Sequence, residues 1–414
     1  MTLTSRTTVK YSNEHYLMFD EFSFKAKNLY NATLYKIRQN YFEGKPPLNC
    51  NGMDKALKFE KSIDYVEMPM ASSAQWTVKN VFQDWDSFCG SKKAYAETPE
   101  KFHSKPKMPK YLHKTKGRAV VYLTNQNIVK KDGMLRFPKC FNGFTIPLEI
   151  EGDIKQVRVV PKNRHYVVEV VYEIAEIPLK EDNSLYLGLD LGLDNFVTAV
   201  SNDGTQPAII NGKGLKSINK RWNKRISHLR EVETAMNGYE VATKTGITRV
   251  SNQTNQQIVL TNKRNNQVND FCHKASKKIV DYARERGCNT VIVGKNDGWK
   301  QESKMNTKVN QSFIQIPHTD FVNMLKYKCQ KHGLNFITVD EAHTSKTSWM
   351  DDESPEHHEK YLGNRIKRGL FRTATGTLIN ADVNGALQII RKVFPKAKAD
   401  GIWACGQPIR VNVV

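Results

Sequence analysis

Residues 186–204 read YLGLDLGLDNFVTAVSNDG and decide how the second half of the chain folds. Two runs of apolar and β-branched residues, YLGLDL and NFVTAVS, surround a short polar turn, and a second turn, NDG, follows them. Alternating runs bounded by such turns are typical of consecutive strands. The short run PAIING at 207–212 completes a predicted meander of three strands.

The rest of this half alternates between predicted helices and strands. Two long basic helices are expected, from about Leu215 to Arg230 and from about Asn252 to Arg286. NTVIVGK at 289–295 reads as a strand, residues 318–332 as a helix, and NFITVDE at 335–341 as a strand. ADVNGALQIIRKVF reads as a final helix that opens at Asp382 and stops before Pro395. A meander followed by helix, strand, helix, strand, helix is the element order of the ribonuclease-H-like fold.

The first half combines helices with strands. The residues 13–42 have helical periodicity, and a second helix is expected to start near Ser72 or Ser73, either of which can cap it. The aromatic residues of that helix, among them Trp85 and Phe88, are interpreted as core residues. The Lys- and Pro-rich segment 101–118 has two equally weighted interpretations, a solvated linker or an extended strand along a phosphate backbone. Residues 119–175 predict an antiparallel barrel or sheet.

The composition favours a nucleic-acid partner. The chain has 414 residues and a formal net charge of +21, an excess that a polyanion neutralises well. A ribosome-associated or merely basic protein has the same charge signature. We find no apolar run of about 18 residues, so a membrane partner is not expected. The seven cysteines form no CxxC pair, which together with an N-terminus without an apolar core favours a reducing cytoplasm.

Two aspartates occupy positions that suit metal-dependent phosphodiester hydrolysis. Asp190 ends the first strand of the meander, and Asp382 lies in the first turn of the final helix. In-line hydrolysis uses two Mg²⁺ ions, whose preferred ligands are carboxylate oxygens. Each aspartate also has an ordinary structural interpretation, Asp382 as a helix N-cap and Asp190 as a turn residue. Asp194, in the turn after Asp190, is interpreted as structural.

The third carboxylate is harder to identify. The strand NTVIVGK carries Gly294 where an acid would suit the site, and Asp297 follows three residues later. The next strand ends in Asp340 and Glu341. Alternate residues of a strand face opposite sides, so Glu341 would face inward if Asp340 faces outward.

These residues resemble a known family. The stretches LGLDLGLDNFVTAVSNDG, VIVGKNDGWKQ, VDEAHTSKTS and GNRIKRGLFRTATGTLINADVNGALQIIRKV look like the RuvC nuclease domain of TnpB (OrfB) proteins, and WDSFCGSKKAYAETPEKFHSKPKMPKY resembles their N-terminal half. Those proteins are transposon-encoded RNA-guided DNA endonucleases, relatives of type V CRISPR effectors. The resemblance makes Asp190 the first RuvC acid and Asp382 the third. A branch with the VGKNDGWKQ phrase carries its second acid at the position of Glu341, so the resemblance implies a relocated ligand.

The resemblance also implies an organisation and partners. We expect a multidomain α+β protein with a β wedge (oligonucleotide-binding-like) domain at 1–12 and 111–180, a helical recognition domain at 13–110, a ribonuclease-H-like RuvC domain at 185–393 and a tail at 394–414. The implied partners are a guide RNA transcribed from the element and a double-stranded DNA target beside a short flanking motif, bound by a protein that is a monomer with its RNA. The expected nucleic-acid-binding residues are Lys79, Gln83, Lys107, Arg118, Asn125, Lys220, Arg221, Lys224 and Arg225.

The family often has a four-cysteine zinc knuckle before the final helix. Here Ser348, Asp351, Thr373 and Thr375 stand about where those cysteines would be, so we expect two Mg²⁺ ions and no zinc. The sequences RGLFRT and TLIN could instead form a hairpin around ATG.

Three functions compete at this point. The first is Mg²⁺-dependent, RNA-guided DNA cleavage. The second is an RNA-guided repressor that binds without cutting, favoured by the missing acid at Gly294 and opposed by the intact Asp190 and Asp382. The third is a strand-transfer transposase, although nothing in the sequence indicates recognition of transposon ends.

Overall fold

The computed structural model describes residues 1–46, 48–243, 246–295, 314–397 and 408–413. The chain forms two compact units, Met1–Ala175 and Glu176–Val414, and each is considered by itself. Both units combine helices with antiparallel strand pairs, so the predicted mixed α/β multidomain architecture is confirmed. Among the described residues, every helix is too short or too polar to cross a membrane.

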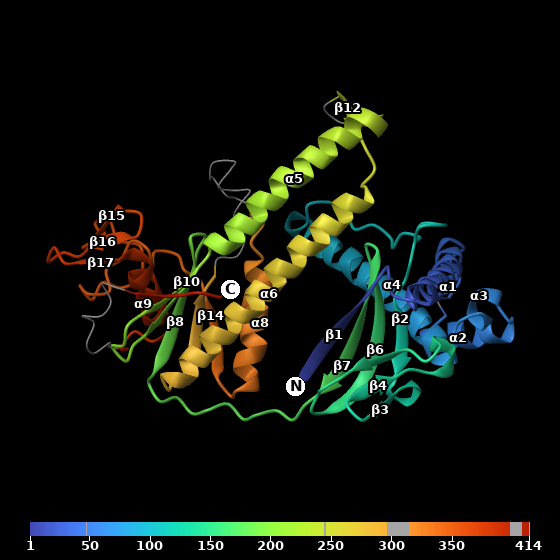
Figure 1. Cartoon of the computed structure of the whole chain (residues 1–414), viewed down its shortest axis with the longest axis horizontal. Coiled ribbons are helices and arrows are strands. Elements are labelled where there is room, and N and C mark those ends of the chain that lie inside the picture. Colours follow the sequence, from blue (N-terminus) through green and yellow to red (C-terminus); the bar gives the residue numbers. More distant parts are fainter. Residues whose placement is uncertain (47, 244–245, 296–313, 398–407, 414) are drawn as a thin grey trace. The chain divides into compact units, whose positions relative to one another are not determined.

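The first unit begins with a strand and then inserts four helices (Figure 1). These elements are β1 (Thr2–Lys10), α1 (Tyr16–Phe42), α2 (Cys50–Phe59), α3 (Ile63–Val66) and α4 (Ala71–Glu97). Trp85 and Phe88 of α4 are buried, as predicted. The predicted serine cap of α4 is wrong: Met70 is the N-cap and makes no side-chain bond, while the hydroxyl of Ser73 donates to the backbone of Tyr122 at 2.5 Å.

Strands complete the first unit after the helices. A four-stranded antiparallel sheet has the order β1-β7-β6-β2, and a smaller sheet has the order β3-β4-β5. The strands are β2 (Val121–Thr124), β3 (Val129–Lys131), β4 (Met134–Arg136), β5 (Thr145–Pro147), β6 (Asp153–Lys162) and β7 (His165–Glu173), with short 3-10 helices η1 (Pro99–Lys101), η2 (Asn125–Asn127) and η3 (Lys139–Phe141). One hydrophobic core joins helices and sheets, with Phe19, Val78 and Val159 all buried in it.

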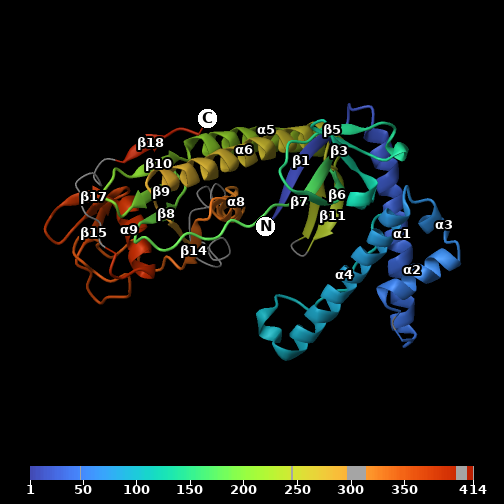
Figure 2. The same cartoon turned by 90° about the horizontal axis from the view of Figure 1, so that it is seen from below.

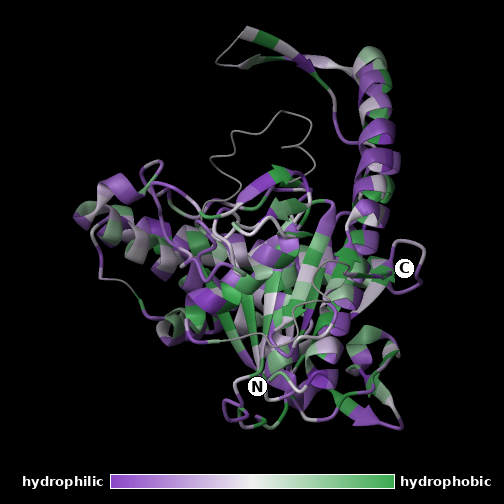
Figure 3. Ribbon diagram, turned by 90° about the vertical axis from the view of Figure 1, so that its left-hand side faces the viewer, coloured by the Kyte–Doolittle hydropathy of each residue, from purple (hydrophilic) through white to green (hydrophobic). Residues whose placement is uncertain are grey.

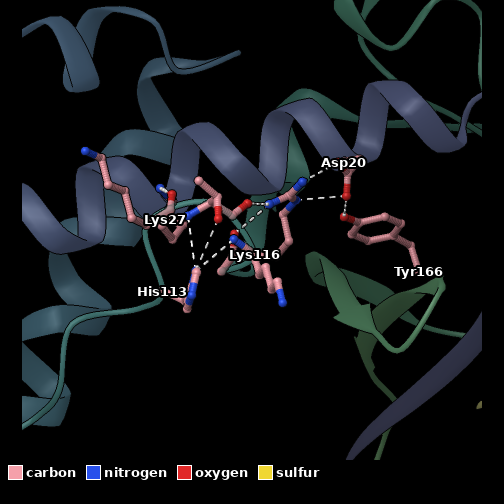
Figure 4. Close-up of polar contacts among 9 residues, drawn as sticks. Asp20, Lys27, His113, Lys116 and Tyr166 are labelled. Atoms are coloured by element: carbon pink, nitrogen blue, oxygen red, sulfur yellow. Dashed lines mark hydrogen bonds and ion pairs between the residues drawn. The ribbon is translucent and has the colours of Figure 1, made fainter. Parts of the chain in front are cut away.

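The end of the basic segment 101–118 is attached to α1 (Figure 4). The ammonium of Lys27 donates to the backbone of Lys114 at 2.7 Å, and Asn31 exchanges two hydrogen bonds with the backbone of Leu112. Arg118 makes a two-bond ion pair with Asp20, which also accepts the hydroxyl of Tyr166. Leu112, Lys114 and Arg118 are therefore attached to α1, although residues 113–116 are exposed, so this end of the segment is not a free linker.

The second unit is built on a six-stranded sheet with the order β14-β13-β8-β9-β10-β18. Its strands are β8 (Tyr186–Leu191), β9 (Asn195–Ser201), β10 (Ala208–Asn211), β13 (Thr290–Gly294), β14 (Asn335–Val339) and β18 (Ile409–Val411). The strands β8, β9 and β10 form the predicted antiparallel meander, while β13 pairs in parallel with both β8 and β14. The strand β18, in the segment expected to be a tail, pairs in parallel with β10.

Helices cover both faces of this sheet. They are α5 (Lys213–Asn237), α6 (Asn255–Glu285), α8 (His318–Lys331) and α9 (Ala381–Val393). Leu187, Leu189 and Leu191 of β8 share one core with α6 and α8, whereas Tyr186 shares another with α9. Strand alternation therefore directs Gly188 and Asp190 to the α9 face.

Two hairpins extend this unit. α5 and α6 run side by side away from the sheet, and the ribbon of β11 (Tyr239–Thr243) and β12 (Gly246–Val250) lies at their far end (Figures 1 and 2). Near α9, β15 (Asn364–Lys367), β16 (Leu370–Arg372) and β17 (Leu378–Asn380) form a small antiparallel sheet. The predicted hairpin of RGLFRT and TLIN is thus confirmed.

Candidate metal centre

Three carboxylates from distant parts of the sequence line one cavity of about 680 Å³ on the α9 side of the sheet. Asp190 comes from β8, Glu341 from the residues just after β14, and Asp382 from the first turn of α9. Residues 191–195 and 342–345 form other parts of the wall. Sequence reasoning named all three acids, and the fold brings them to the same cavity.

Asp190 is partly buried and lies close to α9. A Cβ atom added to Gly385 would lie 3.3 Å from Oδ2 of Asp190, so the glycine lets the helix approach the carboxylate closely. The pKa of Asp190 is raised well above its ordinary value, first by burial and then by the negative charges of Asp382 and Glu341. The positive charge of Arg365 opposes this rise only in part. The environment of Asp190 therefore favours a cation that would compensate the three carboxylates.

Asp382 does not act as the N-cap of its helix. The side chain of Asn380 takes that role, because it accepts the backbone N–H groups of Asp382 and Val383 at 3.0 and 3.2 Å. This leaves the carboxylate of Asp382 to side-chain partners. Asn195 donates from Nδ2 to its Oδ2 at 2.7 Å, and Arg365 donates from Nη2 to its Oδ1 at 3.2 Å.

Glu341 lies against Gly294, the last residue of β13. A Cβ atom at Gly294 would lie 3.0 Å from Oε2 of Glu341 and 3.2 Å from its Cβ. Ile337 and Val339 of β14 pack with α9, so the two-residue period places Glu341 on that side too. Asp340 is exposed and accepts the N–H of Ala342 at 3.2 Å. The pKa of Glu341 is raised to about 7, chiefly by burial and then by Asp340, against the opposing charge of Lys392.

Asp194, interpreted from the sequence as structural, also lines this cavity, where two cations hold its carboxylate. It pairs with Lys216 of α5 and, at 2.6 Å, with Arg368. The hydrogen bond from Lys216 lowers the pKa of Asp194, and burial works against this shift. Asp297, the other acid considered, lies outside the described residues.

The donor set fits magnesium in its chemistry, because all three side chains offer hard oxygen ligands. In the described part of the chain, no three His, Cys, Asp or Glu residues are already arranged closely enough to hold a metal ion. The guanidinium of Arg365 donates to Oδ1 of Asp382, an oxygen that a metal ion could also bind. A metal ion bound through Oδ1 would compete with Arg365 for this carboxylate.

Among the polar residues that line the cavity, sequence reasoning gave no site role to Asn195, Arg365 and Arg368, whose side chains contact its acids. Asn195 stands five residues after Asp190, and this adjacency was a usable signal. The two arginines belong to the β15–β16 hairpin, where the sequence shows no periodicity that would point them toward Asp382 and Asp194.

The predicted nucleic-acid-binding residues fall into separate regions. Lys79 and Gln83 of α4 and Asn125 of η2 are exposed on the first unit, where Trp76 stacks on Tyr122 and Lys79 lies over the Trp76 ring. Lys107 is exposed. Arg118 is instead held by Asp20, with 24% of its side chain accessible.

The other predicted nucleic-acid-binding residues lie on α5 in the second unit. Lys220, Arg221, Lys224 and Arg225 are exposed there. Figure 3 shows hydrophilic residues along the long helix that leads to the β11–β12 ribbon.

The fold and the cavity together define a class: a mixed α/β protein with an acidic, arginine-rimmed cavity at the end of its central strand. Two family models then confirm the resemblance to TnpB (OrfB) proteins. The OrfB_IS605 family, described as probable transposase, matches residues 169–300, and the Cas12f1-like TNB domain matches residues 318–389. A comparison with curated proteins found no match.

Solved structures give remote similarities. The Cas12f1-sgRNA-target DNA complex, determined by cryo-EM, is 14% identical, with 94% of this chain and 98% of that chain covered and a TM-score of 0.37. The mini-RNA-guided endonuclease CRISPR-Cas_phi3 is 10% identical, with 99% of this chain and 93% of that chain covered and a TM-score of 0.49.

Proposed function

We propose that this chain is a transposon-associated, RNA-guided DNA endonuclease with a ribonuclease-H-like RuvC domain. The observation that carries the proposal is the meeting of Asp190, Glu341 and Asp382 in one cavity. The sheet order supports it: an antiparallel meander, β8 to β10, is extended on its other side by the parallel strands β13 and β14. The matches to the OrfB_IS605 and Cas12f1-like TNB families support it as well.

Each residue of the cavity has a role in this proposal. Asp190, Glu341 and Asp382 would hold Mg²⁺, which when bound activates a water and stabilises the leaving oxygen. Asn195 orients Asp382 through its amide N–H. Arg365 and Arg368 bring positive charge to the cavity, where a phosphodiester needs compensation.

The partners follow from the same proposal. A guide RNA would select the DNA strand by base pairing, and α5 would contact the backbone of the duplex. Lys79, Gln83 and Asn125 remain our candidates for reading the flanking motif. We retain the monomeric RNA complex, the cytoplasmic location and the absence of zinc as parts of the proposal. The predicted domain division is retained as well, except that β18 of the predicted tail joins the sheet of the second unit.

The alternative is an RNA-guided repressor that does not cut. Gly294 is the feature that favours it, because the usual acid is missing there. The carboxylate of Glu341 lies in the space beside Gly294, which supports cleavage over simple binding.

The test uses the protein purified with its co-expressed RNA and a DNA library with randomised flanks. We expect Mg²⁺-dependent cleavage of the guide-matched duplex, lost in Asp190→Ala, Glu341→Ala and Asp382→Ala. Asp340→Ala is the matched control, since it removes the neighbouring acid that faces solvent. Tight binding without cleavage at any Mg²⁺ concentration would establish the repressor instead. Normal cutting by Glu341→Ala would remove Glu341 from the metal centre.

A further inference from the structure

One end of the four-stranded sheet in the first unit carries a group of cations beside an exposed tyrosine. β1 ends at Lys10, which lies opposite His165, and His165 in turn lies opposite Lys162 across the β6–β7 turn. Tyr11 follows directly and is 57% exposed. Lys10 and Lys162 are both exposed, so this sheet end offers positive charge and an aromatic ring on one surface.

Arg164 places a positive charge directly against the ring of Tyr11. It occupies the second central position of the tight β6–β7 turn with a φ of 60°, in the left-handed region that favours Gly or Asn. Its guanidinium carbon lies 4.5 Å from the centroid of the Tyr11 ring. Backbone strain of this kind concentrates at functional sites. A glycine would form the turn with less strain but would lack the guanidinium.

Neighbouring aromatic side chains hold the Tyr11 ring in position. Its ring centroid lies 4.9 Å from that of Tyr16, which lies 5.4 Å from that of Tyr166 in the core. The backbone also turns tightly here, because the N–H of Asn13 donates to the carbonyl of Lys10 at 3.0 Å. The exposed ring is thus held in place before any partner binds, which reduces the entropy lost on binding.

We propose that Tyr11 and Arg164 form a stacking platform for an unpaired nucleobase, with Lys10 and Lys162 contacting the adjoining phosphates. Planar aromatic and guanidinium groups stack on any base, and lysines beside them follow the backbone of a single strand. An acidic peptide would use the cations but would leave the flat ring without a matching partner. The platform depends on the proposed function only in that the partner is nucleic acid.

Photocrosslinking tests the platform directly. The full chain is irradiated with single-stranded RNA or DNA of the same sequence containing 5-iodouracil, and the attached peptide is identified by mass spectrometry. We expect the modified base on the peptide that contains Tyr11. RNA crosslinking in preference to DNA assigns the platform to an RNA strand, and equal yields assign it to either strand.

The variants separate stacking from folding. Tyr11→Ala and Arg164→Gly are each expected to lower the yield at this peptide at least fivefold. Tyr11→Phe should crosslink within twofold of wild type. Arg164→Gly should melt at the same or a higher temperature, because it relieves the turn; a purely structural arginine would lower the melting temperature instead. Tyr35→Ala, which removes a tyrosine 55% exposed on α1, is the matched control.

Two results would overturn the platform: crosslinks that never map to the Tyr11 peptide, or an unchanged yield there in both Tyr11→Ala and Arg164→Gly. An acidic peptide that competes equally well against the wild type and Tyr11→Ala would likewise replace nucleic acid as the partner of the cations. The nuclease proposal fails separately, because Asp190→Ala should crosslink like wild type while losing cleavage.

Discussion

At the scale of single residues, the space beside Gly294 determines where the second acid can be. A methyl group there would meet Glu341 and the Cδ1 atom of Ile389, at 2.6 Å from the latter. We predict that Gly294→Ala displaces the Glu341 carboxylate and slows cleavage at least tenfold, because small displacements in an active site are costly. Single-turnover experiments at saturating Mg²⁺ measure this cleavage rate. Gly214→Ala, where an added Cβ meets nothing within 4 Å, is the control. Wild-type rates for both would show that Glu341 does not need this space.

Glu341 also predicts a pH dependence of stability. Its folded pKa of about 7 lies above the ordinary 4.5, so the folded state binds more protons between these values and stability falls as pH rises through them. We predict that Glu341→Gln stabilises the metal-free protein at pH 8 by at most about 3 kcal/mol. Chemical denaturation at several pH values measures the difference. The stability difference between Glu341→Gln and the wild type should vanish near pH 4. A constant difference across the pH range would contradict the prediction.

The sequence identified the three acidic residues but not the side chains that contact them. Strand alternation placed Glu341 and Asp340 on opposite sides, and the family resemblance then chose Glu341. It could not show that Asn380 caps α9, because Asn380 and Asp382 are both good capping residues two positions apart. It also could not place Arg365 on Asp382, since that interaction depends on how an irregular hairpin folds back on the helix.

At the scale of elements, the closeness of α9 to β8 depends on Gly188. A Cβ there would lie 2.3 Å from the backbone oxygen of Ala386 and 2.7 Å from Cγ1 of Ile390. We predict that Gly188→Ala pushes α9 from the sheet, destabilises the protein by about 1–3 kcal/mol and reduces cleavage through Asp382. Urea unfolding and cleavage rates on the same samples check this. A stable protein with full activity would show that α9 tolerates a wider spacing.

Element types were predictable where the hydrophobic period was strong. The period of α9 and the apolar runs of β8, β9 and β13 identified these elements, and their ends differ from the prediction by few residues. α5 continues to Asn237, beyond the predicted Arg230, where polar residues hide the periodicity. Leu112 and Lys114 are hydrogen-bonded to Asn31 and Lys27 of α1, and no local sequence pattern predicts these bonds.

At the scale of the whole molecule, the net charge of +21 predicts binding that weakens steeply with salt. Replacing the exposed Lys220, Arg221, Lys224 and Arg225 by Gln should reduce the salt slope of duplex affinity by about 0.9 for each phosphate that is no longer neutralised. Affinity titrations over a range of salt concentrations measure this. Lys274→Gln with Lys277→Gln is the control, because these lysines of α6 are already paired with Asp270 and Asp281. An unchanged slope would remove α5 from the interface.

The three proposed metal-binding carboxylates come from β8, the residues just after β14, and α9, which the ribosome makes in that order. A nascent chain that has emerged only as far as β14 can bury Asp190 but has no Asp382 to set beside it. The proposed cutting activity therefore cannot arise in an unfinished polypeptide. The order of synthesis therefore delays the proposed nuclease activity until α9 has left the ribosomal exit tunnel and packed on the sheet.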